Sequence, residues 1–205
     1  MEGQINRGSK LGEYIFELSK NSEVKNIVDI GTWNGMGSTK CILDGVLSSD
    51  VNKNAISIEC NKIRFEEAKI NLGFLPPNFK LIHGTIVNAE DLYPMLEKIN
   101  EETEKRWLKE DIFWIKNTPN VLNLLPEKID LLIIDGGEFS GEIEFHKLYE
   151  RCKFIILDDT NKNKCSKNWK NRDFILSYPD KFQIIDDNLE DRNGFLICKN
   201  IKKDE

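Results

Sequence analysis

The sequence contains no apolar run long enough to cross a membrane as a helix, which needs about 20 residues. Its first residues, MEGQINRGSKLGEY, also lack the basic stretch followed by an apolar stretch that marks a secretory signal. These two absences argue against a membrane protein and against secretion. They predict a cytoplasmic protein with no membrane span.

Cysteine and histidine are both scarce. The 205 residues include five cysteines, an odd number, and no two of them form a CxxC pair. This pattern supports neither a disulfide framework nor a zinc knuckle, and it predicts free thiols. Two isolated histidines, His83 and His146, are too few for a His-rich metal site.

Basic residues are fewer than acidic ones, with 29 Lys and Arg against 35 Asp and Glu and a net charge of −6. Proteins that bind nucleic acid gain most of their affinity from clustered basic side chains, so no nucleic-acid partner is expected. The segment 161–172 is a local exception, because it contains no acid. Its basic side chains could attract an anionic substrate, although a solvated helix face is the simpler explanation. They are Lys162, Lys164, Lys167, Lys170 and Arg172.

What the sequence does contain is a repeated alternation of short β-branched runs and amphipathic helical patterns. Continuous apolar runs suit parallel strands that are buried on both faces, so the alternation predicts an α/β fold with a doubly wound, mostly parallel sheet. A closing segment with Asn193 and Gly194 in a polar turn predicts a C-terminal antiparallel hairpin, for seven strands in all. The first five strands are expected at 26–30, 55–59, 79–83, 129–135 and 153–158.

The length suits a single domain that covers residues 1–205. Residues 1–25 are expected to form an N-terminal helical extension, in which Ser9 could cap the helix. The segment from about 97 to 126 is longer than a simple crossover needs. It therefore predicts an insertion or a lid.

The segment 92–107, which leads into this insertion, predicts a helix with one apolar face, formed by Leu92, Leu96, Ile99 and Trp107. Phe113 and Trp114 follow within the insertion. Their aromatic faces could stack on sugar rings. Ordinary core packing or a contact within a homodimer is the alternative, and the oligomeric state is left open.

A glycine-rich stretch, VDIGTWNGMGST at 28–39, directly follows the start of the first predicted strand. Ligands of open α/β sheets bind at the carboxyl ends of strands, and glycine allows the backbone to approach them closely. The spacing GxxxGxG, at Gly31, Gly35 and Gly37, differs from the GxGxxG of dinucleotide-binding loops. The loop predicts a cofactor site without a pyrophosphate grip, unless it is only a turn between strand and helix.

Glu59 ends the second predicted strand, in ISIEC. A carboxylate at this place can accept hydrogen bonds from both hydroxyls of a ribose, as acids do in nucleotide-binding folds. The alternatives are a helix N-cap and a solvated acid. Together with the glycine loop, Glu59 favours a nucleoside-containing cofactor, either NAD or S-adenosylmethionine.

Five motifs, in this order, resemble those of the class I S-adenosylmethionine-dependent methyltransferases: VDIGTWNGMGSTKCIL, ISIEC, LIHGTIV, IDLLIIDGGEFSG and KFIILDDTN. The resemblance covers about residues 26–200. Within that superfamily the chain is most similar to metal-dependent O-methyltransferases of the catechol and macrolide-sugar kind, and to methyltransferases associated with polysaccharide synthesis. Trp33 departs from the family pattern, because many members have a glycine there.

The resemblance implies S-adenosylmethionine as the cofactor. It places the glycine loop around the methionine part, Glu59 at the ribose and the segment 83–85 at the adenine. The residues implied to bind the cofactor are Asp29, Gly31, Thr32, Trp33, Asn34, Gly35, Ser38, Glu59, Cys60, His83, Gly84, Thr85 and Asp135.

Three aspartates end predicted strands, Asp135 the fourth and Asp158 with Asp159 the fifth. If these strands are neighbours, the carboxylates converge at one edge of the sheet and repel each other unless a cation lies among them. Oxygen ligands suit Mg²⁺ or Mn²⁺, and the ion could bind an acceptor hydroxyl and lower its pKa. The resemblance agrees, because acids in these places are the metal ligands of the metal-dependent members. The alternative is that the aspartates cap the helices that follow.

Methyl transfer also requires a group that takes the proton of the acceptor. Asp135 is one catalytic candidate, and Glu138 is the other. Related enzymes place a lysine or histidine base at the position of Glu138, so the resemblance nominates this residue while its chemical identity departs from the pattern. Glu138 could instead bind a metal or a sugar hydroxyl, or lie at a helix N-terminus.

These features predict an S-adenosylmethionine-dependent O-methyltransferase, assisted by Mg²⁺ or Mn²⁺, that acts on a hydroxyl of a sugar or glycan. A small phenolic or catechol acceptor is an alternative. Another is a non-catalytic cofactor-binding module that is fused to, or associates with, a glycosyltransferase. An NAD-dependent oxidoreductase is a third alternative, although the sequence has no recognisable hydride-transfer dyad.

Overall fold

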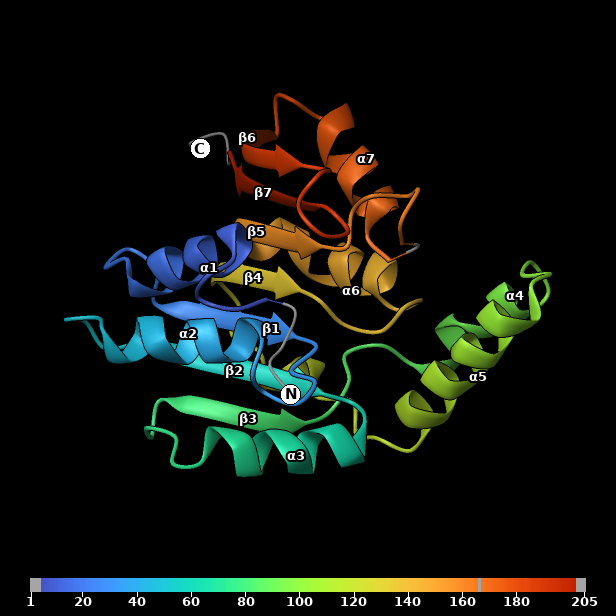
Figure 1. The fold of residues 1–205 in the computed structure, drawn as a ribbon, viewed down its shortest axis with the longest axis horizontal. Coiled ribbons are helices and arrows are strands. Elements are labelled where there is room, and N and C mark those ends of the chain that lie inside the picture. The colour runs from blue at the N-terminus through green and yellow to red at the C-terminus, as the bar shows by residue number, and fades with distance from the viewer. Residues whose placement is uncertain (1–4, 166, 202–205) are drawn as a thin grey trace.

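The computed structural model describes residues 5–165 and 167–201, which form one seven-stranded sheet between two layers of helices (Figure 1). The strands are β1 Asn26–Ile30, β2 Asn54–Glu59, β3 Phe79–His83, β4 Ile129–Ile134, β5 Cys152–Asp158, β6 Phe182–Asn188 and β7 Phe195–Asn200. Their order is β3-β2-β1-β4-β5-β7-β6, and β7 runs antiparallel to both of its neighbours. The predicted mostly parallel sheet with a closing hairpin is confirmed.

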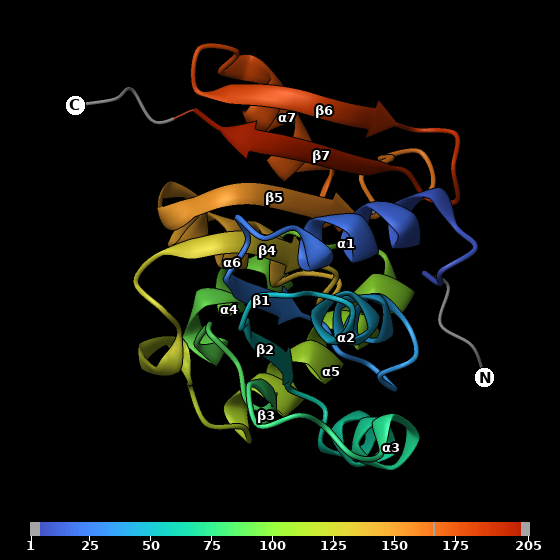
Figure 2. The same ribbon diagram turned by 90° about the vertical axis from the view of Figure 1, so that its left-hand side faces the viewer.

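Helices cover both faces of this sheet (Figure 2). The α-helices are α1 Lys10–Lys20, α2 Ser38–Leu47, α3 Lys62–Leu72, α4 Tyr93–Leu96, α5 Glu102–Lys116, α6 Gly141–Leu148 and α7 Trp169–Ser177. Three 3₁₀ helices are η1 Ala89–Asp91, η2 Leu122–Leu124 and η3 Tyr149–Arg151. Helices α1 to α3 pack on one face of the sheet and α4 to α7 on the other. Within the described residues, none of these helices combines the length and the apolar character that a bilayer crossing requires.

The side chains of the central strands alternate between the two helical layers. In β1, Ile27 packs on the face of α1 and α2, whereas Val28 packs on the opposite face. In β4, Leu131 and Leu132 divide in the same way. All four side chains are fully buried. Burial on both faces is the reason why these strands are mostly apolar in sequence.

The order of the strands reverses between β1 and β4, which pair at the centre of the sheet. Strands β2 and β3 follow on one side of this point and β5 on the other. The parallel strands β1 to β5 therefore end at the same edge, which faces α5 in Figure 1. Open α/β sheets bind their ligands at this edge, outside the point of reversal.

The N-terminal helix is capped as predicted. The hydroxyl of Ser9 accepts a hydrogen bond from the N–H of Gly12 at 3.1 Å, and α1 then packs along α2. Just before α1, the buried side chain of Ile5 reaches the cavity at the carboxyl ends of the strands. Residues 1–4 of the predicted extension lie outside the described residues.

The single helix predicted across 92–107 is wrong. Two helices, α4 and α5, share this region, because the side chain of Glu101 accepts a hydrogen bond from the N–H of Glu104 at 2.7 Å and so caps a new helix. Helix α5 is anchored to the core by the buried Leu108, whereas Trp107 is 42% exposed. Both helices project beyond the ends of the strands (Figure 1).

Candidate active site

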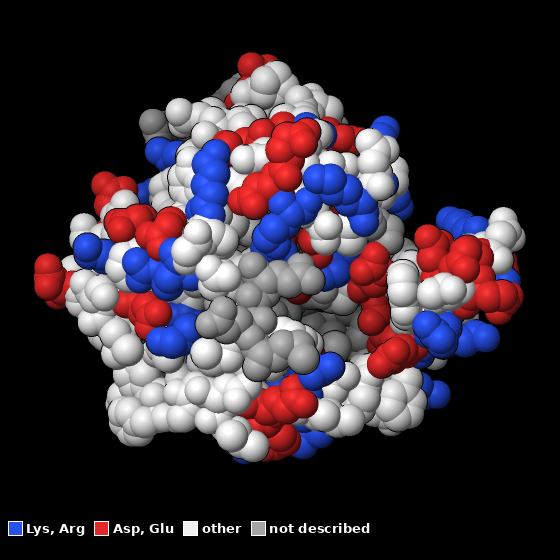
Figure 3. Space-filling view, viewed as in Figure 1, with Lys and Arg blue, Asp and Glu red and all other residues white. Residues whose placement is uncertain are grey.

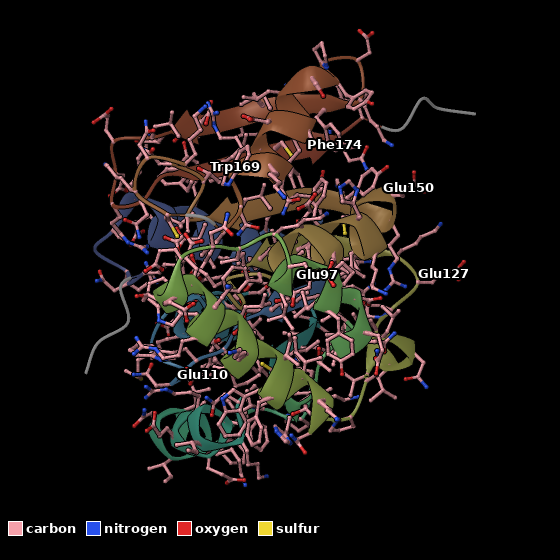
Figure 4. All side chains as sticks on the ribbon, turned by 90° about the vertical axis from the view of Figure 1, so that its right-hand side faces the viewer. Glu97, Glu110, Glu127, Glu150, Trp169 and Phe174 are labelled. Carbon is pink, nitrogen blue, oxygen red and sulfur yellow. The ribbon has the colours of Figure 1, made fainter. Side chains whose placement is uncertain are left out.

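A cavity of about 510 Å³ lies at the carboxyl ends of the parallel strands. The glycine loop after β1 and the end of β2 form one side of it, and α5 and the segment after β4 form another. In Figure 3, acidic and basic side chains both gather around the hollow between the sheet and the projecting α5. Figure 4 looks onto this edge across α5, which carries the cavity residue Glu110, and shows Trp169 at the start of α7.

The glycine loop contains three residues with a left-handed backbone. The φ angle is +100° at Gly31, +50° at Trp33 and +82° at Gly35. A Cβ on Gly31 would lie 2.1 Å from the carbonyl oxygen of Asp135, so the end of β1 can approach the end of β4 this closely only with glycine. Trp33 thus takes a conformation that glycine adopts more readily, and the guanidinium of Arg64 lies 5.3 Å from the centre of its ring.

Asp29 supports this loop from below. Its carboxylate accepts hydrogen bonds from the hydroxyls of Ser38, Thr39 and Ser57 at 3.0, 2.7 and 2.7 Å. These bonds connect β1, β2 and the first turn of α2. Burial raises the pKa of Asp29, and the three hydroxyl donors oppose that shift. The side chain is fully buried and does not line the cavity, so its position is that of a support for the loop.

Glu59 connects the glycine loop to the start of α3. Its Oε2 accepts a hydrogen bond from the N–H of Trp33 at 2.6 Å, and its Oε1 accepts one from the N–H of Asn61 at 2.8 Å. The N-cap of α3 is Asn61, and Glu59 is only 8% exposed. Glu59 is therefore neither a helix N-cap nor a solvated acid, the two alternatives considered from the sequence. Burial raises the pKa of Glu59 to about 7, against the effect of the two N–H donors. Each carboxylate oxygen has a second lone pair for a ligand.

The wall of the cavity continues beyond Glu59 with Cys60, Gly84 and Thr85. His83 lies behind this wall, with its Nε2 3.2 Å from the carbonyl oxygen of Cys60. A Cβ on Gly84 would lie 2.6 Å from the side chain of Val121, so the segment that leads from α5 to β4 packs directly against this glycine. The insertion and the sheet are thereby joined at the far end of the cavity.

The three aspartates of the predicted metal site come together at the ends of β4 and β5. One carboxylate oxygen from each of Asp135, Asp158 and Asp159 lies within 4.8 Å of the other two, and we refer to these residues as the acid trio. The N-caps of the helices that follow are Ser140 and Asn168. The alternative that the aspartates cap these helices is therefore excluded.

Two side-chain cations of the described chain contact the acid trio. The Nζ of Lys167 lies 3.0 Å from Oδ2 of Asp159 and 3.7 Å from Oδ1 of Asp135. The Nη2 of Arg192 lies 3.0 Å from Oδ2 of Asp158. Burial raises the pKa of both Asp135 and Asp158. The negative charge of Asp158 raises that of Asp135 further, and the charge of Asp159 does the same for Asp158. Lys167 opposes the shift at Asp135, and Arg192 opposes it at Asp158.

The solvated helix face expected for the basic run 161–172 is confirmed only in part. Lys162, Lys164 and Lys170 are exposed, but only Lys170 and Arg172 lie on a helix, and Lys167 and Arg172 are largely covered. Lys167 belongs to the site, and its side chain is only 20% exposed. Three others have partners elsewhere: Lys164 bonds the carbonyl oxygens of Leu189 and Arg192, Lys170 pairs with Glu142, and Arg172 pairs with Asp187.

No protein-family model and no curated protein matches the chain, but solved structures do. An O-methyltransferase from Bacillus cereus in complex with SAH matches with a TM-score of 0.60 and 14% identity, over 95% of this chain and 82% of the other. A methyltransferase from Geobacter sulfurreducens matches with a TM-score of 0.59 and 13% identity, over 97% and 82%. The O-methyltransferase TomG from Streptomyces achromogenes, in complex with SAM, matches with a TM-score of 0.56 and 12% identity, over 94% and 80%.

The chain has the class I methyltransferase fold. This methyltransferase fold differs from the dinucleotide-binding fold in the placement of β7, which lies antiparallel between β5 and β6. In the dinucleotide-binding fold a sixth strand lies directly beside the fifth. The topology therefore does not support the NAD-dependent oxidoreductase considered from the sequence.

Most residues implied to bind the cofactor line the cavity of this methyltransferase fold, and four of them lie behind its wall. Those that line it are Gly31, Thr32, Trp33, Ser38, Glu59, Cys60, Gly84, Thr85 and Asp135. Those behind the wall are Asp29, Asn34, Gly35 and His83. Asn34 and Gly35 shape the loop from this position, since the side-chain oxygen of Asn34 accepts the N–H of Met36 at 3.1 Å.

The catalytic candidate Glu138 also lines the cavity. It precedes Ser140, the N-cap of α6, so it lies outside the first turn of that helix. Its Oε1 is 3.8 Å from the sulfur of Cys165, which lines the cavity as well. Asp159 lines the cavity with Asp135, whereas Asp158 lies behind them against Arg192.

Three further acids that line the cavity, Glu110 and Asp111 of α5 and Glu144 of α6, were missed in the sequence. Asp111 and Glu144 lie on the buried faces of their helices, Asp111 one turn after Leu108 and Glu144 one turn before Leu148. An acid at an apolar position of a helical pattern is the signal that could have revealed both. Trp114, which the sequence placed in the insertion, lines the cavity beside Asp111.

Glu144 is expected to lower the stability of the unliganded methyltransferase fold at neutral pH. Its side chain is buried, its Oε2 has no hydrogen-bond partner, and burial raises its pKa from an ordinary value of 4.5 to about 7. Because the pKa is higher in the folded state, the folded protein binds the proton more tightly. The free energy of unfolding therefore falls as the pH rises from about 4.5 to about 7.

We therefore expect Glu144→Gln to be more stable than the wild type above pH 7, by at most about 3 kcal/mol, and equally stable near pH 4.5. Urea denaturation at several pH values measures this difference. The exposed Glu150 provides a control, since Glu150→Gln should show no pH-dependent gain. A Glu144→Gln difference that stays constant from pH 4.5 to 8 would contradict the expectation.

Proposed function

We propose that the protein transfers the methyl group of S-adenosylmethionine to a hydroxyl of a sugar or glycan. The observation that carries this proposal is one cavity in which the glycine loop and Glu59 face Asp135 and Asp159. Methyl transfer from a sulfonium is an in-line displacement, so it needs a donor site and an acceptor site in this kind of proximity. Two similar structures with the same fold, bound to SAH and to SAM, support the choice of cofactor.

The charge of the cavity suits this cofactor. S-adenosylmethionine carries a positive sulfonium, whereas the sulfur of its product is neutral. Acidic side chains around the sulfur would therefore favour the donor over the product. The acids that line the cavity are Glu59, Glu110, Asp111, Asp135, Glu138, Glu144 and Asp159, against the cations Arg64, Lys167 and Arg192.

A divalent cation, Mg²⁺ or Mn²⁺, forms the finer part of this proposal. The donor set suits such an ion, because three carboxylate oxygens lie within 4.8 Å of one another and Oδ1 of Asp159 is buried without a hydrogen-bond partner. Asp135, Asp158 and Asp159 would hold the ion. When bound, it would lower the pKa of an acceptor hydroxyl.

In this proposal Asp135 takes the proton of the acceptor. Its carboxyl group lines the cavity, and burial together with the charge of Asp158 raises its pKa well above the usual value. A carboxylate with a raised pKa is a stronger base. Glu138 lines the same cavity three residues further along and is the second candidate for this role.

The acceptor wall of the cavity offers both donors and acceptors of hydrogen bonds. The indole N–H of Trp114 is buried without a partner, while Glu110 and Asp111 supply carboxylate oxygens. A ligand with several hydroxyl groups can satisfy both kinds of group, which is why we favour a sugar or glycan over a phenol. Association with a glycosyltransferase remains a prediction of the same proposal.

Incubation with methyl-labelled S-adenosylmethionine and Mn²⁺ or Mg²⁺, against a panel of sugars and catechols, tests this function. We expect label in a sugar, and a loss of turnover of about a hundredfold or more on chelation or in Asp158→Ala, since the substitution removes a member of the acid trio and leaves Arg192 without this carboxylate. Asp180→Ala, at an exposed acid after α7, is the matched control and should keep full activity.

Three outcomes would count against the proposal in different ways. Label in catechols alone would replace the sugar by a phenolic acceptor. Binding of S-adenosylmethionine without transfer to any member of the panel would favour the non-catalytic module. Turnover that survives both chelation and Asp158→Ala would remove the divalent cation from the reaction.

A further inference from the structure

Two cationic side chains, those of Lys167 and Arg192, already contact the acid trio. Lys167 lies between two of the carboxylates, at 3.0 Å from Oδ2 of Asp159 and 3.7 Å from Oδ1 of Asp135. Arg192 pairs with the third carboxylate, that of Asp158, at 3.0 Å. Lys167 therefore contacts the two acids of the trio that line the cavity, and Arg192 contacts the one that lies behind them.

The backbone next to Lys167 is firmly anchored to the ends of the same two strands. The side-chain nitrogen of Asn168 donates to the carbonyl oxygen of Ile134 at 3.2 Å and to that of Asp158 at 2.8 Å. The N–H of Asn168 donates to the carbonyl oxygen of Asp159 at 3.1 Å. These bonds hold the residue after Lys167 against the ends of β4 and β5. The fold therefore keeps Lys167 beside the acid trio.

Lysine is protonated at neutral pH, and the ammonium of Lys167 has two carboxylates, those of Asp135 and Asp159, as its partners. A protonated lysine donates hydrogen bonds and accepts none. It therefore uses the same carboxylate lone pairs that a metal ion would need.

An ammonium and a divalent ion compete for two reasons. Mg²⁺ and Mn²⁺ bind oxygen at short distances, about 2.0 to 2.2 Å, and so require the carboxylate oxygens for themselves. Two like charges a few ångströms apart also repel strongly where water is scarce. Lys167 is 20% exposed and Asp159 is 7% exposed, which leaves little solvent to screen them.

We propose that the ammonium of Lys167 and a divalent cation are alternative occupants of the acid trio, so that Lys167 sets how tightly the chain binds the ion. The ion enters as the side chain of Lys167 leaves Asp135 and Asp159, while Arg192 continues to neutralise Asp158. The role of the bound ion in this inference rests on the proposed function. Its binding does not, because binding of the ion requires neither cofactor nor acceptor.

Titration of the protein with Mn²⁺, followed by the electron paramagnetic resonance signal of the free ion, tests the competition. Lys167→Met removes the charge and keeps most of the side-chain volume, so it should bind Mn²⁺ at least about tenfold more tightly than the wild type. Lys167→Arg keeps the cation and should remain weak. Lys170→Met is the matched control, because Lys170 pairs with Glu142 outside the cavity and its loss should leave Mn²⁺ affinity unchanged.

A second measurement uses the wild type, and so does not depend on the folding of any variant. Acetic anhydride modifies free lysine amines, and peptide mass spectrometry reports the extent of modification at each lysine. We expect saturating Mn²⁺ to increase the modification of Lys167 at least about threefold, because the ion displaces its ammonium from the carboxylates. Lys170 should react equally with and without Mn²⁺.

Equal Mn²⁺ affinities of the wild type and a folded Lys167→Met, including no binding by either, would overturn the inference. So would modification of Lys167 that does not change when Mn²⁺ binds to the wild type. Neither result would bear on methyl transfer itself, which the labelled-cofactor assay tests separately. Conversely, an absence of methyl transfer would leave the competition between Lys167 and Mn²⁺ intact.

Discussion

Replacing Gly31 by alanine is expected to disrupt the glycine loop and abolish cofactor binding. The new Cβ would lie 2.1 Å from the carbonyl oxygen of Asp135 and 2.7 Å from the Cα of Gly136, and both are backbone atoms that cannot rotate away. The φ angle of +100° adds strain for any L side chain. We expect the free energy of unfolding to fall by about 3 kcal/mol or more in urea denaturation, with no detectable heat of S-adenosylhomocysteine binding.

Gly73→Ala separates the collision from the backbone strain. Gly73 follows α3 with a φ of +62°, but a Cβ there would meet no atom within 4 Å. This variant should lose about 1 to 2 kcal/mol from strain alone and keep its affinity for the cofactor. If Gly31→Ala were no less stable than Gly73→Ala and still bound S-adenosylhomocysteine, the close approach of β1 to β4 would not be what shapes the loop.

Replacing Glu59 by glutamine is expected to weaken cofactor binding by about a hundredfold, which corresponds to about 2.7 kcal/mol. The two carboxylate oxygens accept hydrogen bonds from the N–H groups of Trp33 and Asn61 at 2.6 and 2.8 Å. Glutamine has one oxygen and one NH₂ group, so one backbone N–H would face another donor in a buried place. The substitution would disturb the glycine loop or the start of α3, and it would also remove acceptor sites for a ribose. Isothermal calorimetry with S-adenosylhomocysteine measures this loss.

The pH dependence of binding gives a second measure of the role of Glu59. Burial raises its pKa to about 7, so the carboxylate is ionised above that pH and increasingly protonated below it. A protonated carboxyl group offers fewer acceptor sites, and we therefore expect the dissociation constant of the wild type to rise as the pH falls from about 8 to about 5.5. Glu59→Gln should lack this component of the pH dependence.

Glu66→Gln is the control for both measurements on Glu59. Glu66 is a partly exposed acid of α3 that pairs with Lys62 and Lys69, away from the cavity. It should bind S-adenosylhomocysteine like the wild type at every pH. An unchanged affinity in Glu59→Gln would show that the carboxylate neither holds the loop nor meets the ribose.

The strands were predictable because each carries its own local signal. The run NIVDI is β-branched at three of its five positions and coincides with β1. Both faces of the strand are covered by helices, so no solvent-facing position interrupts the pattern. The N-terminal helix was predictable for a similar reason, since the hydroxyl of Ser9 and the N–H that it caps are three residues apart.

The region between β3 and β4 was less predictable. Leu92 and Leu96 fit a helical spacing with Ile99 and Trp107, yet Glu101 caps a new helix and turns the chain before Trp107. Spacing alone does not reveal where a helix is interrupted. The packing of α5 against the core through Leu108 then sets which of its side chains reach the cavity.

The position of a residue at the end of a strand was enough to bring the acid trio together, because parallel neighbours end at the same edge of a sheet. Lys167 was different. In sequence it is one member of a basic run that reads as a solvated face, and its partners Asp135 and Asp159 lie on other elements. The charge balance of the site could not be inferred from local spacing.

The order of the amino acids alone specifies the layers of this protein, its strand ends, its glycine loop and the acids that end β4 and β5, because each depends on the residues adjacent in the chain. The burial of Glu144 and Asp111, the support that Asp29 gives to the loop, and the placement of Lys167 on the acid trio arise only when distant segments pack together. Charges act through space, so their partners are set by the folded arrangement and not by separation along the chain.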